Sequence, residues 1–219
     1  MADHYNKPVK KLPSDTFCIL PWIHLSTRPD GSMRVCCTAN ASAVGATNDK
    51  GDAGGRVGIV KTDDGRPANL NNSDLHTSWN NDYMRNVRTQ MLAGEKPASC
   101  LKCYKEEAAG HRSKRQWETD YWMRDGIDVD ELVAQTYEDG STDSKLRYID
   151  IRMGTKCQLG CIMCSPHDSS GWVKDWNKIY PQITNESLKQ TMTWENKGKE
   201  FGANYNWHKN NPVFWEQFY

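Results

Sequence analysis

Three of the eight cysteines lie close together in the second half of the chain, at Cys157, Cys161 and Cys164, with the spacing C-x3-C-x2-C. A 4Fe-4S cube has four iron corners, so three thiolates from one short loop leave one iron without a protein ligand. No cysteine follows Cys164, whereas a ferredoxin-type run supplies a fourth. The spacing therefore predicts an iron-sulfur cluster with one open coordination position.

A structural zinc site is the alternative interpretation of this loop. Zinc in such sites takes four tight ligands and commonly uses C-x2-C pairs. Three cysteines at this spacing fit that pattern poorly, although His167, three residues after Cys164, offers a fourth donor. The spacing favours the cluster over zinc.

The run Cys157-Gln158-Leu159-Gly160-Cys161-Ile162-Met163-Cys164 resembles the signature of the radical S-adenosylmethionine superfamily. The resemblance implies that S-adenosylmethionine binds the open iron through its amino and carboxylate groups. It also implies that an electron from the cluster cleaves the sulfonium to give a 5′-deoxyadenosyl radical, with an electron donor such as a flavodoxin or ferredoxin as partner. Met163 stands where the family has an aromatic or large apolar residue near the adenine, which makes it a cofactor-binding candidate.

A second set of cysteines lies in the first half of the chain, at Cys18, the adjacent pair Cys36 and Cys37, and Cys100 with Cys103. A hairpin would bring Cys18 near the adjacent pair, and the C-x2-C pair lies at the start of a predicted helix. Four thiolates complete a closed site, which suits an iron-sulfur cluster or zinc. The neighbouring three-cysteine loop favours iron-sulfur, with a role in electron relay or substrate placement.

This half of the chain resembles the twitch domain, which carries auxiliary clusters in many peptide-modifying radical enzymes. The matching segments are Phe17-Cys18-x-x-Pro21-Trp22, Pro29-Asp30-Gly31 followed by Cys36-Cys37, and Gly94-Glu95-Lys96-Pro97 before Cys100-x-x-Cys103-Tyr104. The resemblance implies an auxiliary cluster on Cys18, Cys36, Cys100 and Cys103, because Cys36 lies five residues after Gly31, as in the family's strand. In its usual form the twitch domain follows the barrel, whereas here the matching segments precede the barrel's first strand. The resemblance also implies a peptide or protein substrate. Charged residues downstream, such as Glu107 and Arg115, match only loosely and are interpreted as a solvated helical face.

The elements that must position these cysteines follow from periodicity and turn residues. Alternation up to Leu25, the turn Pro29-Asp30-Gly31 and renewed alternation over Met33–Cys36 predict a hairpin. Glycine interrupts any pattern over 38–72, apart from a short strand at 57–60. Helices are predicted from Asn81 or Asp82 to Gly94, from Tyr104 to Trp122, from Asp128 to Tyr137 and from about Ser170 to Tyr180. The strongest predicted strand covers 146–153, directly before the three-cysteine loop.

These elements predict an α/β chain, α+β overall, in which a small cysteine-rich domain of a hairpin and helices precedes the start of a partial (β/α)6 barrel. The predicted divisions are a flexible arm at 1–16, a twitch-like auxiliary-cluster domain at 17–140 and the N-terminal part of a radical S-adenosylmethionine barrel at 141–219. Such a barrel needs roughly 200 residues. Too few follow Cys164, and the family's Gly-Gly-Glu segment is missing. We therefore expect an incomplete barrel, with Trp194–Tyr219 loosely packed.

Composition narrows the classes of function. The chain of 219 residues carries 28 basic and 28 acidic side chains, so no overall field draws it to nucleic acid or to an anionic membrane. Mean hydropathy is −0.83, no apolar run approaches the roughly 20 residues that cross a bilayer, and the N-terminus has no signal-peptide pattern. We expect a cytoplasmic protein with reduced thiols and no membrane or nucleic-acid partner. A two-cluster iron-sulfur electron-transfer protein and a zinc-binding interaction module remain as alternative functions.

Overall fold

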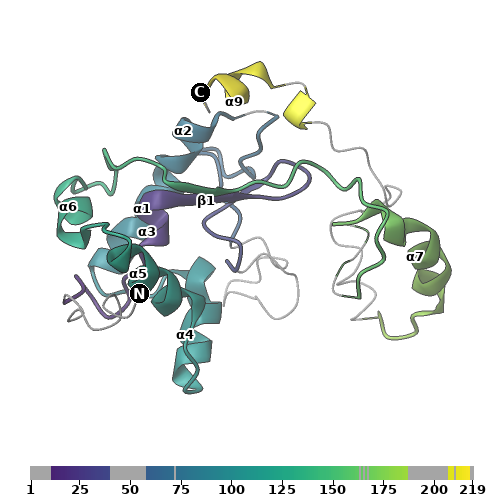
Figure 1. The fold of residues 1–219 in the computed structure, drawn as a ribbon, viewed down its shortest axis with the longest axis horizontal. Helices are drawn as coiled ribbons and strands as arrows, with labels where there is room; N and C mark the ends of the chain where they lie inside the picture. The colour runs from purple at the N-terminus through teal and green to yellow at the C-terminus, as the bar shows by residue number, and fades with distance from the viewer. Residues whose placement is uncertain are drawn as a thin grey trace.

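The computed structural model describes residues 11–39, 58–71, 73–162, 164, 166, 168–186, 207–209 and 211–217. Over these residues, helices surround one three-stranded sheet, so the chain is of the α+β class. The central strand β1 (His24–Thr27) pairs antiparallel with β2 (Met33–Arg34) and parallel with β3 (Tyr148–Asp150). Figure 1 shows α1, α3 and α5 on one side of β1, and α2 and α9 on the other. Within the described part of the chain, the sheet closes no barrel.

The predicted hairpin is confirmed. Ser26 faces Arg34 across the β1–β2 pair, and in the turn Gly31 donates its N–H to the carbonyl of Arg28 at 2.9 Å. Alternation predicted one buried face, but all four residues of β1 are buried, because this strand is the centre of the sheet. The short helix α1 (Leu20–Ile23) directly precedes β1, where strand alternation was expected to begin.

Strand β3 joins the hairpin's sheet across the boundary predicted at residue 140. Its register sets Tyr148 beside His24, and the N–H of Arg147 donates to the carbonyl of Ile23 at 2.8 Å. The strand predicted over 146–153 is paired only over three residues, because β1 offers a short partner. The first strand of the predicted barrel is therefore hydrogen-bonded to the cysteine-rich half of the chain.

Helix α3 (Asp82–Leu92) follows the prediction closely. The side chain of Asn81 caps its first turn by accepting the N–H of Met84, and Gly94 lies just beyond its end. The single helix predicted over Tyr104–Trp122 is wrong.

The chain forms two helices there, α4 (Leu101–Ala108) and α5 (Lys114–Arg124). Gly110 lies in the break, and a capping box between Ser113 and Gln116 starts α5. The break brings Glu107 of α4 against Arg115 of α5.

The remaining helices are short. Helix α6 (Val129–Ala134) is capped by Asp128 and ends before the predicted Tyr137. The helix predicted over 170–180 is confirmed, as α7 (Val173–Ile179) between two 3-10 turns. The other elements are α2 (Leu75–Trp79), η1 (Ala98–Cys100), η2 (Ser170–Trp172), η3 (Tyr180–Gln182), η5 (Trp207–Lys209) and α9 (Pro212–Glu216). None of the described helices is both long and apolar enough to cross a membrane.

Both ends of the described chain are packed more tightly than predicted. Trp207 and Phe214 are 1% and 0% exposed, so the predicted loose packing is wrong for these residues. Trp207 covers the hairpin turn, where a side chain added at Gly31 would lie 2.9 Å from its ring, and Phe214 packs edge-on against Trp207. In the segment predicted as a flexible arm, buried Thr16 donates to the carbonyl of Met91 at 3.2 Å. Residues 1–10, and Trp194 at the start of the expected loose segment, lie outside the described residues.

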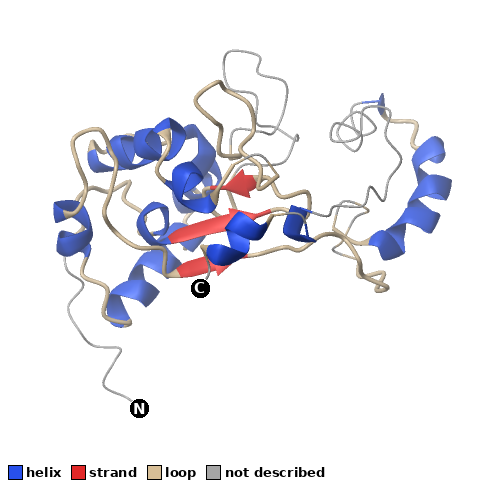
Figure 2. Ribbon diagram, turned by 90° about the horizontal axis from the view of Figure 1, so that it is seen from above, coloured by secondary structure: helices blue, strands red, loops and turns tan. Residues whose placement is uncertain are grey.

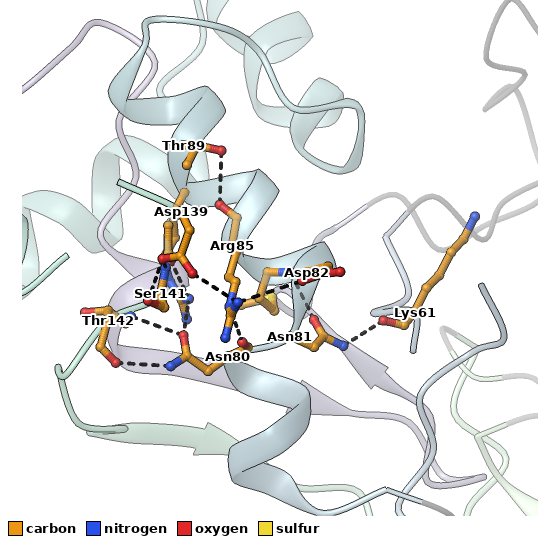
Figure 3. A network of polar contacts seen from close by, with 12 residues as sticks. Lys61, Asn80, Asn81, Asp82, Arg85, Thr89, Asp139, Ser141 and Thr142 are labelled. Carbon is orange, nitrogen blue, oxygen red and sulfur yellow. Dashed lines mark hydrogen bonds and ion pairs between the residues drawn. The ribbon is translucent and has the colours of Figure 1, made fainter. Parts of the chain in front are cut away.

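A polar network fixes the loop before β3 against the start of α3 (Figure 3). Arg85 donates to Asp139 at 3.0 Å, and the side-chain oxygen of Asn80 accepts the N–H of Thr142 at 3.2 Å. Gly140 approaches α3 so closely that an added Cβ would lie 2.3 Å from the carbonyl oxygen of Arg85. These contacts set the direction in which the chain enters β3.

Fully buried Arg88, one turn after Arg85 in α3, binds the same loop. Its guanidinium donates to the carbonyls of Pro21, Trp79 and Gly140 at 2.8, 2.7 and 3.1 Å and lies over the Trp79 ring. Burial lowers the pKa of Arg88 to about 9, and the positive charge of Arg85 acts in the same direction. Arg88 therefore ties α1, α2 and the loop before β3 to one helix.

Candidate functional sites

The structure brings Cys18, Cys36, Cys100 and Cys103 to one cavity, the four-cysteine cavity. Cys18 precedes α1, Cys36 follows β2, Cys100 ends η1, and Cys103 lies in the first turn of α4. Apolar side chains supply much of the remaining wall: Leu20, Val35, Ala39 and Met91. Cys37 does not line the cavity, although it is adjacent to Cys36. The sheet and the α4 helix thus gather thiols from three separate segments.

Burial governs the chemistry of these thiols. It raises the pKa of Cys18 well above its ordinary value, and Cys100 and Cys36 raise it further. Burial likewise raises the pKa of Cys36, and that of Cys100 to about 12. The thiols of Cys18, Cys36 and Cys100 are therefore neutral at pH 7, and a bound cation would be needed to displace their protons.

The donor set of the cavity is that of a tetrathiolate centre, either zinc or an iron-sulfur cluster. All eight cysteines are free thiols. The cavity encloses about 20 Å³, room for one water molecule. Among the described residues, no group of three or more His, Cys, Asp or Glu side chains is already arranged to hold a metal ion. The donor types fit such a centre, and the four side chains must turn to form it.

Buried Arg115 and half-buried Glu107 form an ion pair beside this cavity. Arg115 is 7% exposed, binds Glu107 through two nitrogens at 2.6 and 2.9 Å, and donates to the carbonyl of Phe17 at 2.6 Å. The prediction of a solvated helical face is wrong for this pair. The turn between α4 and α5 folds the two side chains together, which a continuous helix would not do.

The loop that holds Cys157, Cys161 and Cys164, the three-cysteine loop, leads out from β3 and folds against η2. Ser169 donates its hydroxyl to the carbonyl of Leu159, and Trp172 donates its indole N–H to that of Cys161, both at 2.9 Å. These bonds hold the backbone of the loop and leave its thiols available. The structure assigns η2 an anchoring part that the sequence interpretation missed, although the run Ser169-Ser170-Gly171-Trp172 could have suggested it.

The thiols of this loop are more accessible than those of the cavity. Cys161 is exposed, and Cys157 and Cys164 are half-buried. The N–H of Leu159 donates to the sulfur of Cys157 at 3.4 Å. Gly171 lies so close that an added Cβ would sit 2.9 Å from the carbonyl oxygen of Leu159. Met163 and His167 lie outside the described residues.

Topology places the two sites toward opposite ends of the sheet. Cys18 precedes β1, and Cys36 follows the antiparallel strand β2, so both lie toward the end where β1 begins. Because β3 runs parallel to β1, the three-cysteine loop leaves from the other end. Figures 1 and 2 show α7, which follows that loop, set apart from the other helices.

A larger cavity, of about 550 Å³, lies between α2 and residues 144–151. Apolar side chains and two cations line it: Leu75, Trp79, Leu146, Ile149, Ile151, Lys145 and Arg147. None of the eight cysteines borders this cavity, so it is separate from both cysteine sites.

Comparison with known proteins adds no relative, because no family model, curated protein or solved structure matches the chain.

Proposed function

We propose that this chain acts in radical S-adenosylmethionine chemistry. The three-cysteine loop would hold a 4Fe-4S cluster with one open iron, and the four-cysteine cavity an auxiliary iron-sulfur cluster. The observation that carries the proposal is the C-x3-C-x2-C loop, whose thiols are accessible while its carbonyls are bound to η2. β3, directly before the loop, is proposed as the first strand of a partial barrel.

The residues of the loop would hold and orient the reacting groups. When bound at the open iron, S-adenosylmethionine supplies a 5′-deoxyadenosyl radical after one-electron reduction. The bonds from Ser169 and Trp172 fix the loop backbone, and with it the spacing of the three thiols. The N–H of Leu159 withdraws charge from the sulfur of Cys157, and Met163 is proposed to lie against the adenine. A peptide or protein substrate, a flavodoxin or ferredoxin as electron donor, and a cytoplasmic location complete the proposal.

Two alternatives make different use of the same thiols. A two-cluster electron-transfer protein would load both sites and bind no S-adenosylmethionine. A zinc-stabilised interaction module would fill the four-cysteine cavity with zinc, which suits four thiolates well. The open iron favours the radical function, because an electron carrier has no need of a missing ligand.

Anaerobic reconstitution with iron and sulfide tests the proposal. The expected result is two clusters per chain, with only one remaining when the loop cysteines are replaced by alanine. S-adenosylmethionine should change the electron paramagnetic resonance signal of the dithionite-reduced loop cluster, and 5′-deoxyadenosine should form. Two reducible clusters whose electron paramagnetic resonance signals do not change on addition of S-adenosylmethionine would favour the electron carrier. Zinc without iron-sulfur absorption would favour the interaction module.

A further inference from the structure

Three cations line the four-cysteine cavity, and each is paired with a carboxylate that does not line it. The pairs are Lys102 with Glu106 at 3.9 Å, Lys114 with Glu118, and Arg115 with Glu107 at 2.6 Å. No Asp or Glu is among the described residues that border this cavity. Each pair therefore contributes its cationic residue, and not its carboxylate, to the wall of the cavity.

We infer that these three cations tune the four-cysteine cavity to accept an electron, by raising the reduction potential of the cluster proposed there. The inference rests on the proposed auxiliary cluster. Each electron that enters from a low-potential one-electron donor makes a thiolate-bound cluster more negative by one charge. Cations at the wall stabilise that reduced state, because reduction potentials of such clusters follow the local charge. A purely structural zinc site would gain no such effect, since zinc does not change its oxidation state.

The three cations differ in how firmly they are held. Arg115 is nearly buried and is fixed by Glu107 and the carbonyl of Phe17. The side chain of Lys114 is 23% exposed, whereas that of Lys102 is 54% exposed. Solvent screens an exposed charge more strongly, so the effect on the potential should be smallest for Lys102. Arg115 also holds the fold together, which makes Lys114 the better residue to change.

The test uses the full chain with the three loop cysteines replaced by alanine, so that only the cavity site can load a cluster. Its midpoint potential is measured by anaerobic redox titration, followed by electron paramagnetic resonance. Lys114→Met should lower the ratio of reduced to oxidised cluster at a fixed potential by about fivefold, or about 40 mV for one electron. Lys114→Arg should keep the parent potential. Lys105→Met is the matched control, because Lys105 is exposed on α4 and does not line the cavity.

Iron and sulfide content, measured on every variant, distinguishes a failure of this inference from a failure of the proposed auxiliary cluster. If the cavity loads a cluster but Lys114→Met and Lys102→Met both keep the parent potential, the inference is overturned and the proposed function stands. An equal shift in Lys105→Met would also overturn it, because the effect would then be one of net charge. If the site takes up zinc and no iron-sulfur cluster, the auxiliary cluster and the inference fail together. Circular dichroism spectra that match the parent show that each variant is folded.

Discussion

A buried histidine in the central strand should make the stability of this protein fall at mildly acidic pH. His24 is 0% exposed, its Nδ1–H donates to the carbonyl of Tyr148 at 2.9 Å, and its ring stacks on the Tyr148 ring. Its Nε2 has no hydrogen-bond partner among the described residues. Burial lowers the pKa of His24 from 6.5 to about 4, with the positive charge of Lys114 acting in the same direction. The hydrogen bond to Tyr148 and the carboxylates of Asp150 and Glu118 oppose this shift without cancelling it.

The sign follows from which state binds the proton. In the unfolded chain His24 takes up a proton below pH 6.5, whereas in the folded chain it stays neutral until about pH 4. The stabilisation is therefore complete above pH 6.5 and is lost as the pH falls through this window. With 1.36 kcal/mol per pKa unit, the loss is about 2 kcal/mol at pH 5 and about 3 kcal/mol at pH 4.

Thermal unfolding, followed by circular dichroism at pH 7.5 and pH 5, measures this effect. A loss of about 2 kcal/mol lowers the Tm of a chain of this size by about 4–8 °C. His24→Asn keeps a donor near the Tyr148 carbonyl but cannot titrate. Between pH 7.5 and pH 5 its Tm should therefore fall by about 4–8 °C less than the Tm of the parent. His76→Asn, at an exposed position of α2, should behave as the parent. Equal drops in Tm for the parent and His24→Asn would refute the reasoning.

Three further substitutions test contacts that hold the two sites in place. Arg88→Met should lower the free energy of unfolding by about 3 kcal/mol in urea titrations, because several buried carbonyls lose their donor; a loss below about 1 kcal/mol would contradict the role given to Arg88. Gly140→Ala should cost about 3 kcal/mol and its control Gly110→Ala about 1 kcal/mol, since both have φ near 80° but only the first would clash with backbone. Gly171→Ala should lower the iron content from two clusters per chain toward one by displacing the three-cysteine loop, whereas Gly160→Ala, with open space around it, should not. Equal iron content in these last two variants would show that η2 does not position the loop.

Local signals in the sequence were sufficient for the hairpin and for α3. The turn Pro29-Asp30-Gly31 and the cap at Asn81 act through neighbouring residues, so their effect could be predicted. The end of α4 was also encoded locally, by Gly110 and the capping box at Ser113, but the charge-rich pattern on both sides of the break masked it. These elements needed no knowledge of distant contacts.

Contacts between distant segments could not be predicted in the same way. The pairing of β1 with β3 joins residues 124 positions apart, such as His24 and Tyr148, and no periodicity reports a partner at that distance. The burial of Trp207 against the hairpin turn has the same origin. For the candidate sites, cysteine spacing indicated which thiols belong together, whereas the cations around the four-cysteine cavity depend on how α4 and α5 pack.

The β1–β3 pair is a common frame for the two cysteine sites. The short helix α1 connects Cys18 to β1, and Cys157 follows β3 along the chain. The positions of both cysteines therefore depend on the same hydrogen-bonded register of β1 and β3. Partly buried polar contacts reinforce that register: His24 binds the carbonyl of Tyr148, and Ser26 donates to the carboxylate of Asp150 at 3.2 Å. Apolar side chains at these positions could also pack the two strands together, and they would avoid the cost of burying an imidazole. The polar pairs instead make a register shift expensive, because a slip would leave several buried groups unpaired. We therefore expect the strand pair to keep the two sites at a fixed separation, which an electron relay between them would require.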